Sequence, residues 1–275
     1  MKKVLAISGG VDSMCLLHML KDDKDVVVAH FNHGTRPSAD DDEKFVASYA
    51  KKYGLPFYSE KAQLGADVSE ADARSARYAF LKKLSQKLDG KIFTAHHQND
   101  LFESIAINLL RGTGWRGLTP FYDAEIERPM LKMSKSEIYQ YATEHQIVFR
   151  QDPTNVEEKY LRNRLRFDIA DFARTISANK LQNLFTQQRV LRAKIEDLAS
   201  GILPYDSIYS RSLFKYLDNS TAEELLRAVL ARSGISATRP QLDDFLHAIK
   251  TYESGKKFNL PKDQLVKFNK TEFML

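Results

Sequence analysis

A glycine-rich turn near the start of the chain combines residue types that bind anions. The segment SGGVDS occupies residues 8–13 and follows an apolar run at residues 4–7. Its glycines allow the backbone to approach a ligand closely, and a helix that begins here offers unpaired N–H groups to a phosphate. Ser8 and Ser13 add hydroxyl donors, whereas Asp12 beside a phosphate implies that Mg²⁺ shares the site. A tight strand–helix turn with a capping Asp is the structural alternative.

A second group of polar residues follows the apolar run at residues 92–95. Asp100 and Glu103 are three positions apart on a predicted helix, so they share one face. His96 and His97 precede them at the predicted strand end. A capping acid, a solvated glutamate and structural histidines are the alternatives. Because ligands of parallel sheets bind at the carboxyl ends of the strands, we expect these side chains near the ligand.

The apolar run at residues 26–30 leads into further polar residues, His30, Asn32, His33 and Arg36. These could line the nucleotide or RNA side of a site. Two histidines and one Asn without further ligands are a poor zinc signature. Arg111 opens a glycine-containing loop and is predicted to clamp an anion.

The segment at residues 159–194 is strongly basic, with nine Lys or Arg against two Asp, a net charge of +7. Arg162 and Arg166 are four positions apart on a predicted helix, with Asn163 between them and Tyr160 before them. Guanidinium groups suit phosphates and base edges, and a tyrosine can stack on a splayed base. The segment therefore predicts contact with nucleic acid. A solvated, salt-bridged helix face is the alternative.

The elements that must position these residues alternate in the first half of the chain. Apolar runs at 4–7, 26–30, 55–58 and 92–95 alternate with helical patterns at 13–20, 38–54, 69–88, 101–110 and 134–145. Ser69 with Asp72, and Ser134 with Glu137, have the spacing of helix caps. This alternation predicts an α/β fold with a Rossmann-like parallel sheet and helices on both faces.

The second half of the chain has a different pattern. Leucines and isoleucines at helical spacing predict a long helix from about residue 181 to 198, a second helix capped by Thr221, and a third around residues 242–249. Short strands are expected after Gly255. We therefore expect two domains, residues 1–168 and a smaller, mainly helical domain at residues 169–275 that contacts RNA.

Composition restricts the class of protein. The 275 residues contain one cysteine, Cys15, which excludes a disulfide framework and a thiolate metal cluster and is expected to be a small core residue. No secretory leader and no membrane span are expected, because the first residues lack a long apolar region and no stretch approaches the length of a span. A cytoplasmic protein with no membrane partner is expected.

The glycine loop and several further segments together resemble one known family. The loop is not a Walker A motif, because Val11 and Asp12 stand where that motif has Lys-Ser/Thr. It resembles instead the PP-loop of the N-type ATP pyrophosphatases. The segments HFNHGTR (30–36), SEADARSARY (69–78), TAHHQNDLFESIAINLLRGTGWRGL (94–118), RPML (128–131) and DPTNVEEKYLRNRLR (152–166) then resemble the tRNA(Ile)-lysidine synthetase family.

This resemblance implies a ligase that forms a C–N bond and converts ATP to AMP and pyrophosphate. ATP adenylates the C2 oxygen of the wobble cytidine in tRNA(Ile) with the CAU anticodon. The amine of free L-lysine then attacks C2, AMP leaves, and the lysidine formed switches decoding from AUG to AUA. ATP and Mg²⁺ are the expected co-substrate and ion, and a homodimer is left open.

The resemblance also assigns roles to residues. Lysine is protonated at neutral pH, so Asp100 and Glu103 could bind its ammonium group and accept a proton. Asp12 completes the catalytic set, and Asp12 and Asp100 are the predicted Mg²⁺ ligands. The predicted ATP-binding residues are Ser8, Gly9, Gly10, Val11, Asp12, Ser13 and His30. The predicted substrate and tRNA contacts are His33, Arg36, His96, His97, Arg111, Tyr160, Arg162, Asn163 and Arg166.

Two departures from the family leave alternatives open. The family usually has two adjacent aspartates where this chain has Asn99 and Asp100, which puts a role for the first carboxylate in doubt. Many members have a further C-terminal domain, so the chain is expected to be a short form or a truncated one. A related PP-loop thiolase and a non-catalytic nucleotide-binding module are the competing functions, although a lone cysteine does not supply the cysteine pair that thiolases generally use.

Overall fold

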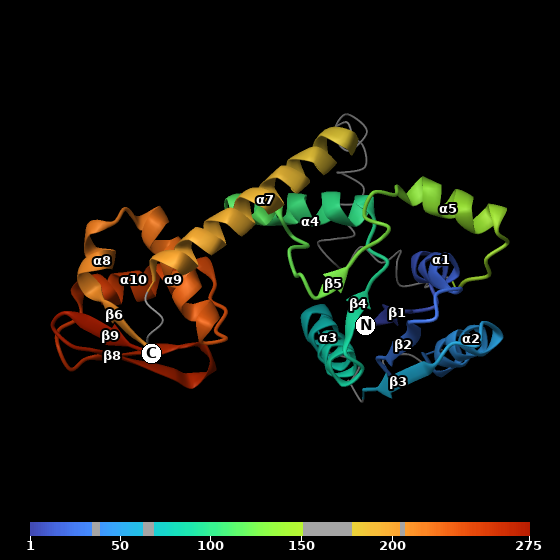
Figure 1. Ribbon diagram of the computed structural model, residues 1–275, viewed down its shortest axis with the longest axis horizontal. Helices are drawn as coiled ribbons and strands as arrows, with labels where there is room; N and C mark the ends of the chain where they lie inside the picture. Colours follow the sequence, from blue (N-terminus) through green and yellow to red (C-terminus); the bar gives the residue numbers. More distant parts are fainter. Residues whose placement is uncertain (35–38, 63–68, 151–177, 204–206) are drawn as a thin grey trace. The chain divides into compact units, whose positions relative to one another are not determined.

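The computed structural model describes residues 1–34, 39–62, 69–150, 178–203 and 207–275. These form two compact units, Met1–Asn183 and Leu184–Leu275 (Figure 1). The expected domain boundary after residue 168 lies outside the described residues.

The first unit is built on a five-stranded sheet. Its strands are β1 (Lys2–Ala6), β2 (Val26–Asn32), β3 (Phe57–Lys61), β4 (Gly90–Phe93) and β5 (Ile126–Glu127). They lie in the order β3-β2-β1-β4-β5, and every neighbouring pair is parallel. The predicted parallel sheet is therefore confirmed. The two residues of β5 are too few to leave an apolar run in the sequence.

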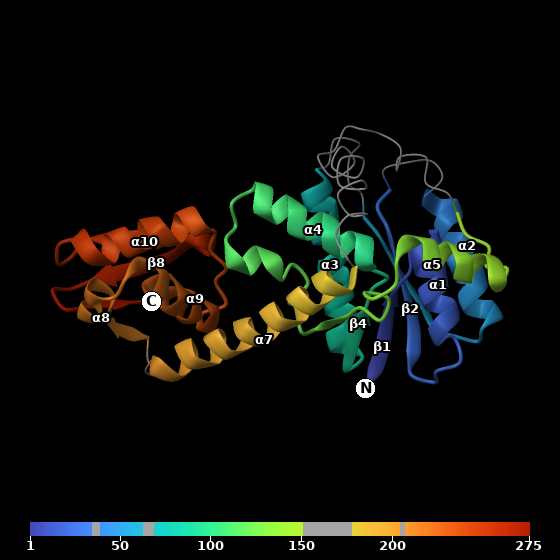
Figure 2. The same ribbon diagram turned by 90° about the horizontal axis from the view of Figure 1, so that it is seen from above.

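Helices cover both faces of this sheet (Figures 1 and 2). They are α1 (Val11–Leu20), α2 (Ala39–Lys52), α3 (Glu70–Lys87), α4 (Gln98–Leu110) and α5 (Lys135–Glu144). All seven residues of β2 are buried, and alternate ones enter different clusters. Val26 and Val28 pack in the core that includes α1, α2 and α5, whereas Val27 and Ala29 pack against α3. Burial of both faces explains why the strand lacks polar alternation.

Hydrogen bonds at the helix starts explain where the helices begin. The Ser69 hydroxyl accepts from the Asp72 amide at 3.1 Å, and Ser134 and Glu137 form a reciprocal capping box, as predicted. Helix α4 begins at Gln98, three residues earlier than expected. The Asp100 carboxylate accepts from the His97 amide at 2.9 Å, which caps this earlier turn.

The second unit contains most of α7 (Ala178–Ile202), together with α8 (Arg211–Tyr216), α9 (Asn219–Arg232) and α10 (Arg239–Thr251). Strands β6 (Ile208–Ser210), β7 (Lys257–Leu260), β8 (Gln264–Phe268) and β9 (Glu272–Met274) form an antiparallel sheet in the order β6-β9-β8-β7. The strands after Gly255 were predicted, whereas β6 and α8 were not.

One predicted cap in this unit is wrong. Asp218, not Thr221, is the N-cap of α9, because its carboxylate accepts from the Thr221 amide at 3.0 Å. Thr221 is thus the third residue of the helix and donates to the cap. Among the described residues, no helix is long and apolar enough to cross a membrane.

Candidate functional site

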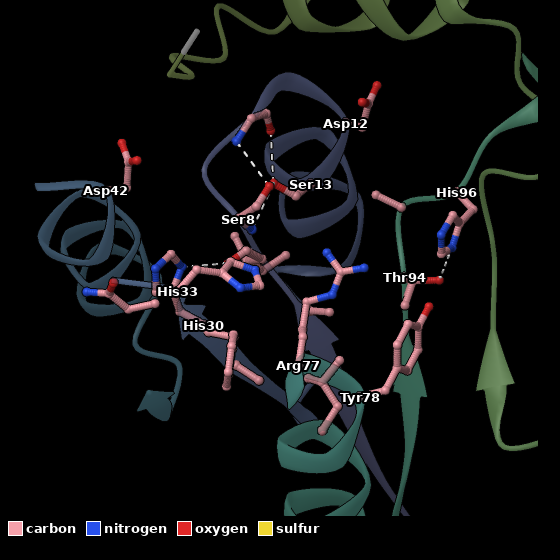
Figure 3. A pocket seen from close by; sticks show the side chains of 18 of the residues that line it. Ser8, Asp12, Ser13, His30, His33, Asp42, Arg77, Tyr78, Thr94 and His96 are labelled. Carbon is pink, nitrogen blue, oxygen red and sulfur yellow. Dashed lines mark hydrogen bonds between the residues drawn. The ribbon is translucent and has the colours of Figure 1, made fainter. Parts of the chain in front are cut away.

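The glycine loop lies at the carboxyl end of β1 and opens helix α1, as the sequence predicted. A cavity of about 510 Å³ lies beside it, at the ends of β1, β2 and β4 (Figure 3). Its polar lining residues are Ser8, Asp12, Ser13, His30, Asn32, His33, Asp42, Arg77, Tyr78, Thr94, His96 and Asp100. The structure therefore brings the loop together with residues from two other strand ends, where ligands of parallel sheets bind.

Local hydrogen bonds centred on Ser13 shape the loop. The Ser13 hydroxyl accepts from the amides of Ser8 and Gly9 at 3.2 and 3.1 Å, and it donates to the Gly10 carbonyl at 2.9 Å. Gly9 has a φ of +95°, which disfavours any side chain there. Gly10 is the N-cap of α1, and no side chain caps this helix start within the described part of the chain. The first turn of α1 thus presents backbone N–H groups that suit an anion.

Lys135 and His97 lie next to the Asp12 carboxylate, which points away from the Ser8 and Ser13 hydroxyls (Figure 3). Lys135 Nζ lies 2.6 and 2.8 Å from its two oxygens. His97 Nε2 lies 3.8 Å from Asp12 Oδ1 and 3.6 Å from Asp100 Oδ2. His97 is therefore placed between the two carboxylates. Lys135 was not predicted, because it is 123 residues from Asp12 in the sequence.

The acidic pair lies on α4, at the carboxyl end of β4. Asp100 lines the cavity while it caps the helix, so the capping alternative holds without removing the residue from the site. Glu103 is buried, at 6% exposure, so the alternative of a solvated glutamate is wrong. A buried carboxyl group one helical turn from Asp100 is an arrangement that suits proton transfer or ammonium binding.

The histidines of the site have different surroundings. His30 is buried, and its Nδ1 lies 2.8 Å from the Ile7 carbonyl oxygen. Burial lowers the pKa of His30, so the ring is neutral at pH 7. His96 Nδ1 lies 2.7 Å from Thr94 Oγ1, and its ring packs on Phe121. His33 lines the cavity and meets Phe31 edge-on.

Arg77 is a further cavity residue that was not singled out in the sequence. It lies on α3 within the segment SEADARSARY, and Figure 3 shows its guanidinium extending into the cavity between the loop and Thr94. Its Cζ lies 5.4 Å from the centre of the neighbouring Tyr78 ring. The sequence signal was the arginine pair at residues 74 and 77, which resembles an ordinary charged helix face until the tertiary structure shows which side chain points inward.

Some predicted residues are not in this cavity. Arg111 is exposed at the end of α4. Gly9, Val11, His97 and Glu103 are buried and do not line the cavity. Arg36, Tyr160, Arg162, Asn163 and Arg166 lie outside the described residues.

The carboxylates of this site suit Mg²⁺ only if substrate phosphates and water supply the remaining ligands. Among the described residues, no group of three or more His, Cys, Asp or Glu could hold a metal ion. Mg²⁺ often binds through one or two carboxylates plus substrate phosphates and water. Asp12 in the loop and Asp100 at the start of α4 both approach His97, and together they fit an ion that arrives with a nucleotide.

Cys15 has no part in this site. It is fully buried in α1, as predicted, and burial raises its pKa to about 11. The thiol is therefore not a nucleophile at neutral pH.

Comparison with known proteins matches the chain to one family. The PP-loop domain model matches residues 1–172. The tRNA(Ile)-lysidine synthase of Petrotoga mobilis is 32% identical over 277 residues, which cover 94% of this chain and 88% of that protein. The enzyme of the same name from Clostridium tetani is 38% identical over 187 residues, covering 62% of this chain but 40% of that protein. The match thus spans less than half of the length of the Clostridium tetani relative.

Solved structures add a likeness of fold. The U34-tRNA thiolase NcsA from Methanococcus maripaludis, solved with its [4Fe-4S] cluster, has a TM-score of 0.57 at 15% identity over 69% of this chain and 72% of that one. With this fold, the glycine loop at the end of β1 and relatives over nearly its whole length, the chain belongs to the tRNA(Ile)-lysidine synthase family of PP-loop proteins.

Proposed function

We propose that this protein joins L-lysine to C2 of the wobble cytidine of tRNA(Ile) with the CAU anticodon, using ATP and passing through an adenylated cytidine. The observation that carries the proposal is that the PP-loop and Asp100 line one cavity in a chain of this family. A nucleotide on the loop would have its reacting phosphorus beside α4. The activity is that of a cytoplasmic ligase that forms a C–N bond.

The loop side of the cavity suits the first step. The cytidine C2 oxygen attacks the α-phosphorus, the bond to the bridging oxygen of the β-phosphate breaks, and pyrophosphate leaves. Ser8, Ser13 and the first amides of α1 can hold the departing phosphates. Arg77 extends toward the same space and can neutralise charge that develops there. Mg²⁺ carried by ATP, held by Asp12 and Asp100, would supply further charge neutralisation.

The α4 side suits the second step. Asp100 and Glu103 can bind the lysine ammonium and accept the proton that must leave before the amine attacks C2. His97 lies between Asp100 and Asp12 and can pass a proton between them or hold both in place. The C–N bond then forms as the C2–O bond to AMP breaks.

The RNA would contact the basic segment of the sequence as well as residues of the site. The basic segment at residues 159–194 contains Tyr160, Arg162, Asn163 and Arg166, which we propose as tRNA contacts. His33, Arg36, His96 and Arg111 are further proposed contacts for the cytidine or its neighbours.

The alternative that this protein is a thiolase with an iron–sulfur cluster lacks the cysteines that such a cluster needs. An iron–sulfur cluster needs several cysteine thiolates, and the chain has only Cys15. The likeness to NcsA at 15% identity concerns the fold.

Incubation with ATP, labelled L-lysine and a tRNA(Ile) transcript tests the proposal. We expect label in the RNA, located at the anticodon by nuclease digestion, together with one AMP for each lysine incorporated. A transcript with U at the wobble position is the matched control and should stay unlabelled. AMP and pyrophosphate release without lysine incorporation would show that another nucleophile is used. No release at all would favour a nucleotide-binding module.

Replacing Arg162 and Arg166 by Glu tests the RNA side separately. We expect weaker tRNA binding and a shallower salt dependence, because fewer phosphates are then neutralised. The slope of the logarithm of tRNA affinity against the logarithm of salt concentration should become shallower by up to about one unit for each phosphate that the protein no longer neutralises. ATP affinity should not change. If tRNA affinity is unchanged, these two arginines do not contact the RNA.

A further inference from the structure

The Asp12 carboxylate is paired with a positively charged side chain of the protein itself. Lys135 Nζ donates to both oxygens, at 2.6 and 2.8 Å. The side chains of Asp12 and Lys135 are 32% and 33% exposed, so the pair is shielded on most sides. A two-oxygen, charge-assisted contact in a half-buried place is stronger than an ordinary surface ion pair.

The position of Lys135 is fixed by the start of α4. Lys135 is the first residue of α5, and its amide donates to Asn99 Oδ1 at 3.0 Å. The amide of Gln98 donates to the Met133 carbonyl at 2.9 Å, so two hydrogen bonds join the two helix starts. Figures 1 and 2 both show these starts side by side. Asn99, the residue that departs from the family pattern, therefore anchors the backbone of Lys135.

Packing holds the rest of α5 against α1, the helix that carries Asp12. Ile138 and Ala142 of α5 are buried in the core shared with α1. The Tyr141 hydroxyl lies 2.9 Å from His18 Nδ1, near the last turn of α1. Lys135 Nζ also lies 5.2 Å from the centre of the Tyr139 ring, a further favourable contact for a cation. These contacts hold α5 where its first residue can present the ammonium group to Asp12.

The electrostatic reason for this pair is the anion site beside it. Asp12 lies in the first turn of α1, next to the amides that attract phosphate. An unpaired carboxylate there would repel a polyphosphate. We propose that Lys135 is a positioning residue that neutralises and orients Asp12, so that the loop can accept the phosphates of ATP even when no divalent cation accompanies them. The inference rests on the proposed function only in taking ATP as the ligand.

The same geometry predicts competition at Asp12. Both oxygens of the carboxylate are occupied by one ammonium group, so a divalent cation must displace or share that contact. Removal of the ammonium group should therefore weaken metal-free ATP binding and strengthen direct cation binding. A residue that only supports the fold would give neither change.

Two binding measurements on Lys135→Met test the inference without tRNA or lysine. Calorimetric titration with ATP in EDTA should show about tenfold weaker binding than wild type, the effect expected when a charge-assisted contact is removed. Titration with Mn²⁺ alone, followed by electron paramagnetic resonance, should show several-fold tighter binding. Lys135→Arg should keep most of the wild-type behaviour.

Lys132→Met is the matched control. It removes the same charge three residues away, and Lys132 is exposed. Circular dichroism and thermal melting should confirm that both methionine variants are folded. If Lys135→Met binds metal-free ATP and Mn²⁺ as Lys132→Met does, or if wild type binds no ATP in EDTA, the inference is wrong. Failure to form lysidine would not affect either binding result, so the two proposals fail independently.

Discussion

The two sides of the Asp12 carboxylate are built in different ways. On the loop side, Ser13 bonds to Ser8, Gly9 and Gly10, all within five residues. On the other side, Lys135 reaches Asp12 from 123 residues away and is placed by Asn99, 36 residues before it. The loop is thus a local structure, whereas the charged cluster exists only when α1, α4 and α5 are packed. A short segment can encode the geometry for phosphate, but it cannot encode the electrostatics around it.

Asp12→Ala should have the largest effect on activity, because Asp12 is part of the glycine loop and also the partner of Lys135 in the charged cluster. We expect AMP formation to fall by ~10³-fold or more, since the variant removes the carboxylate and leaves Lys135 without its partner. Quenched-flow or end-point assays of AMP with tRNA measure the loss. A matching circular dichroism spectrum should show that the fold is kept. AMP formation near the wild-type rate would remove Asp12 from the catalytic set.

Glu103→Gln and Asp100→Asn should each reduce lysine transfer by ~10²-fold, the size expected for a positioned acid or base. These variants test the part of the site that depends on helix packing, because both residues lie on α4 and not on the loop. The measurement is single-turnover lysine incorporation compared with AMP formation. For Glu103→Gln, lysine incorporation should fall more than tRNA adenylation, whereas Asp100→Asn also removes a proposed Mg²⁺ ligand and should lower both steps. Equal losses in both steps for Glu103→Gln would instead assign Glu103 to the nucleotide.

Ser13→Ala tests the glycine loop without changing the charged cluster around Asp12. The variant loses hydrogen bonds to three backbone groups, so ATP affinity should fall by about tenfold and stability by about 1–3 kcal/mol. Ser48→Ala is the matched control, since its exposed hydroxyl donates to the nearby Phe45 carbonyl, away from the loop. Titration with ATP and denaturant unfolding measure the two effects. Equal behaviour of the two variants would mean that Ser13 does not organise the loop.

His30→Gln should change how stability depends on pH. Burial lowers the pKa of His30 in the fold, so the unfolded chain binds more protons as pH falls below the ordinary value of about 6.5. The contribution of the buried, neutral His30 ring to the free energy of unfolding is therefore complete above this pH and is lost as the pH falls below it. Denaturant unfolding from about pH 7.5 to about pH 5 should show a smaller loss for His30→Gln than for wild type, since only wild type has this histidine to protonate. His247→Gln, at an exposed histidine, should follow wild type.

Asn99→Asp should have the smallest effect. A carboxylate oxygen can accept from the Lys135 amide as the Asn99 carbonyl does, so thermal stability and lysine incorporation should change little, with rates within about threefold of wild type. Asn99→Leu, of similar size, cannot accept and should lose more. If Asn99→Asp instead raises activity strongly, the residue acts as a missing carboxylate rather than as an anchor.

Much of the fold could be predicted because it depends on short-range patterns. The apolar runs that became β1, β2 and β4, the caps at Ser69 and Ser134, and the glycine loop each depend on neighbouring residues. The misplaced cap of α9 shows the limit, because Asp218 and Thr221 are both good caps and only the backbone geometry selects one.

The sequence by itself determined the family, the PP-loop at a strand end and the acidic pair on one helix face, since fixed spacing along a strand or helix fixes which residues share a side. Only the tertiary structure decided that Glu103 is buried, that Arg77 extends into the cavity and that Lys135 holds Asp12. Burial and charge pairing depend on which distant surfaces meet. A lysine at the start of α5 has the same sequence signature whether it faces water or a carboxylate on another helix.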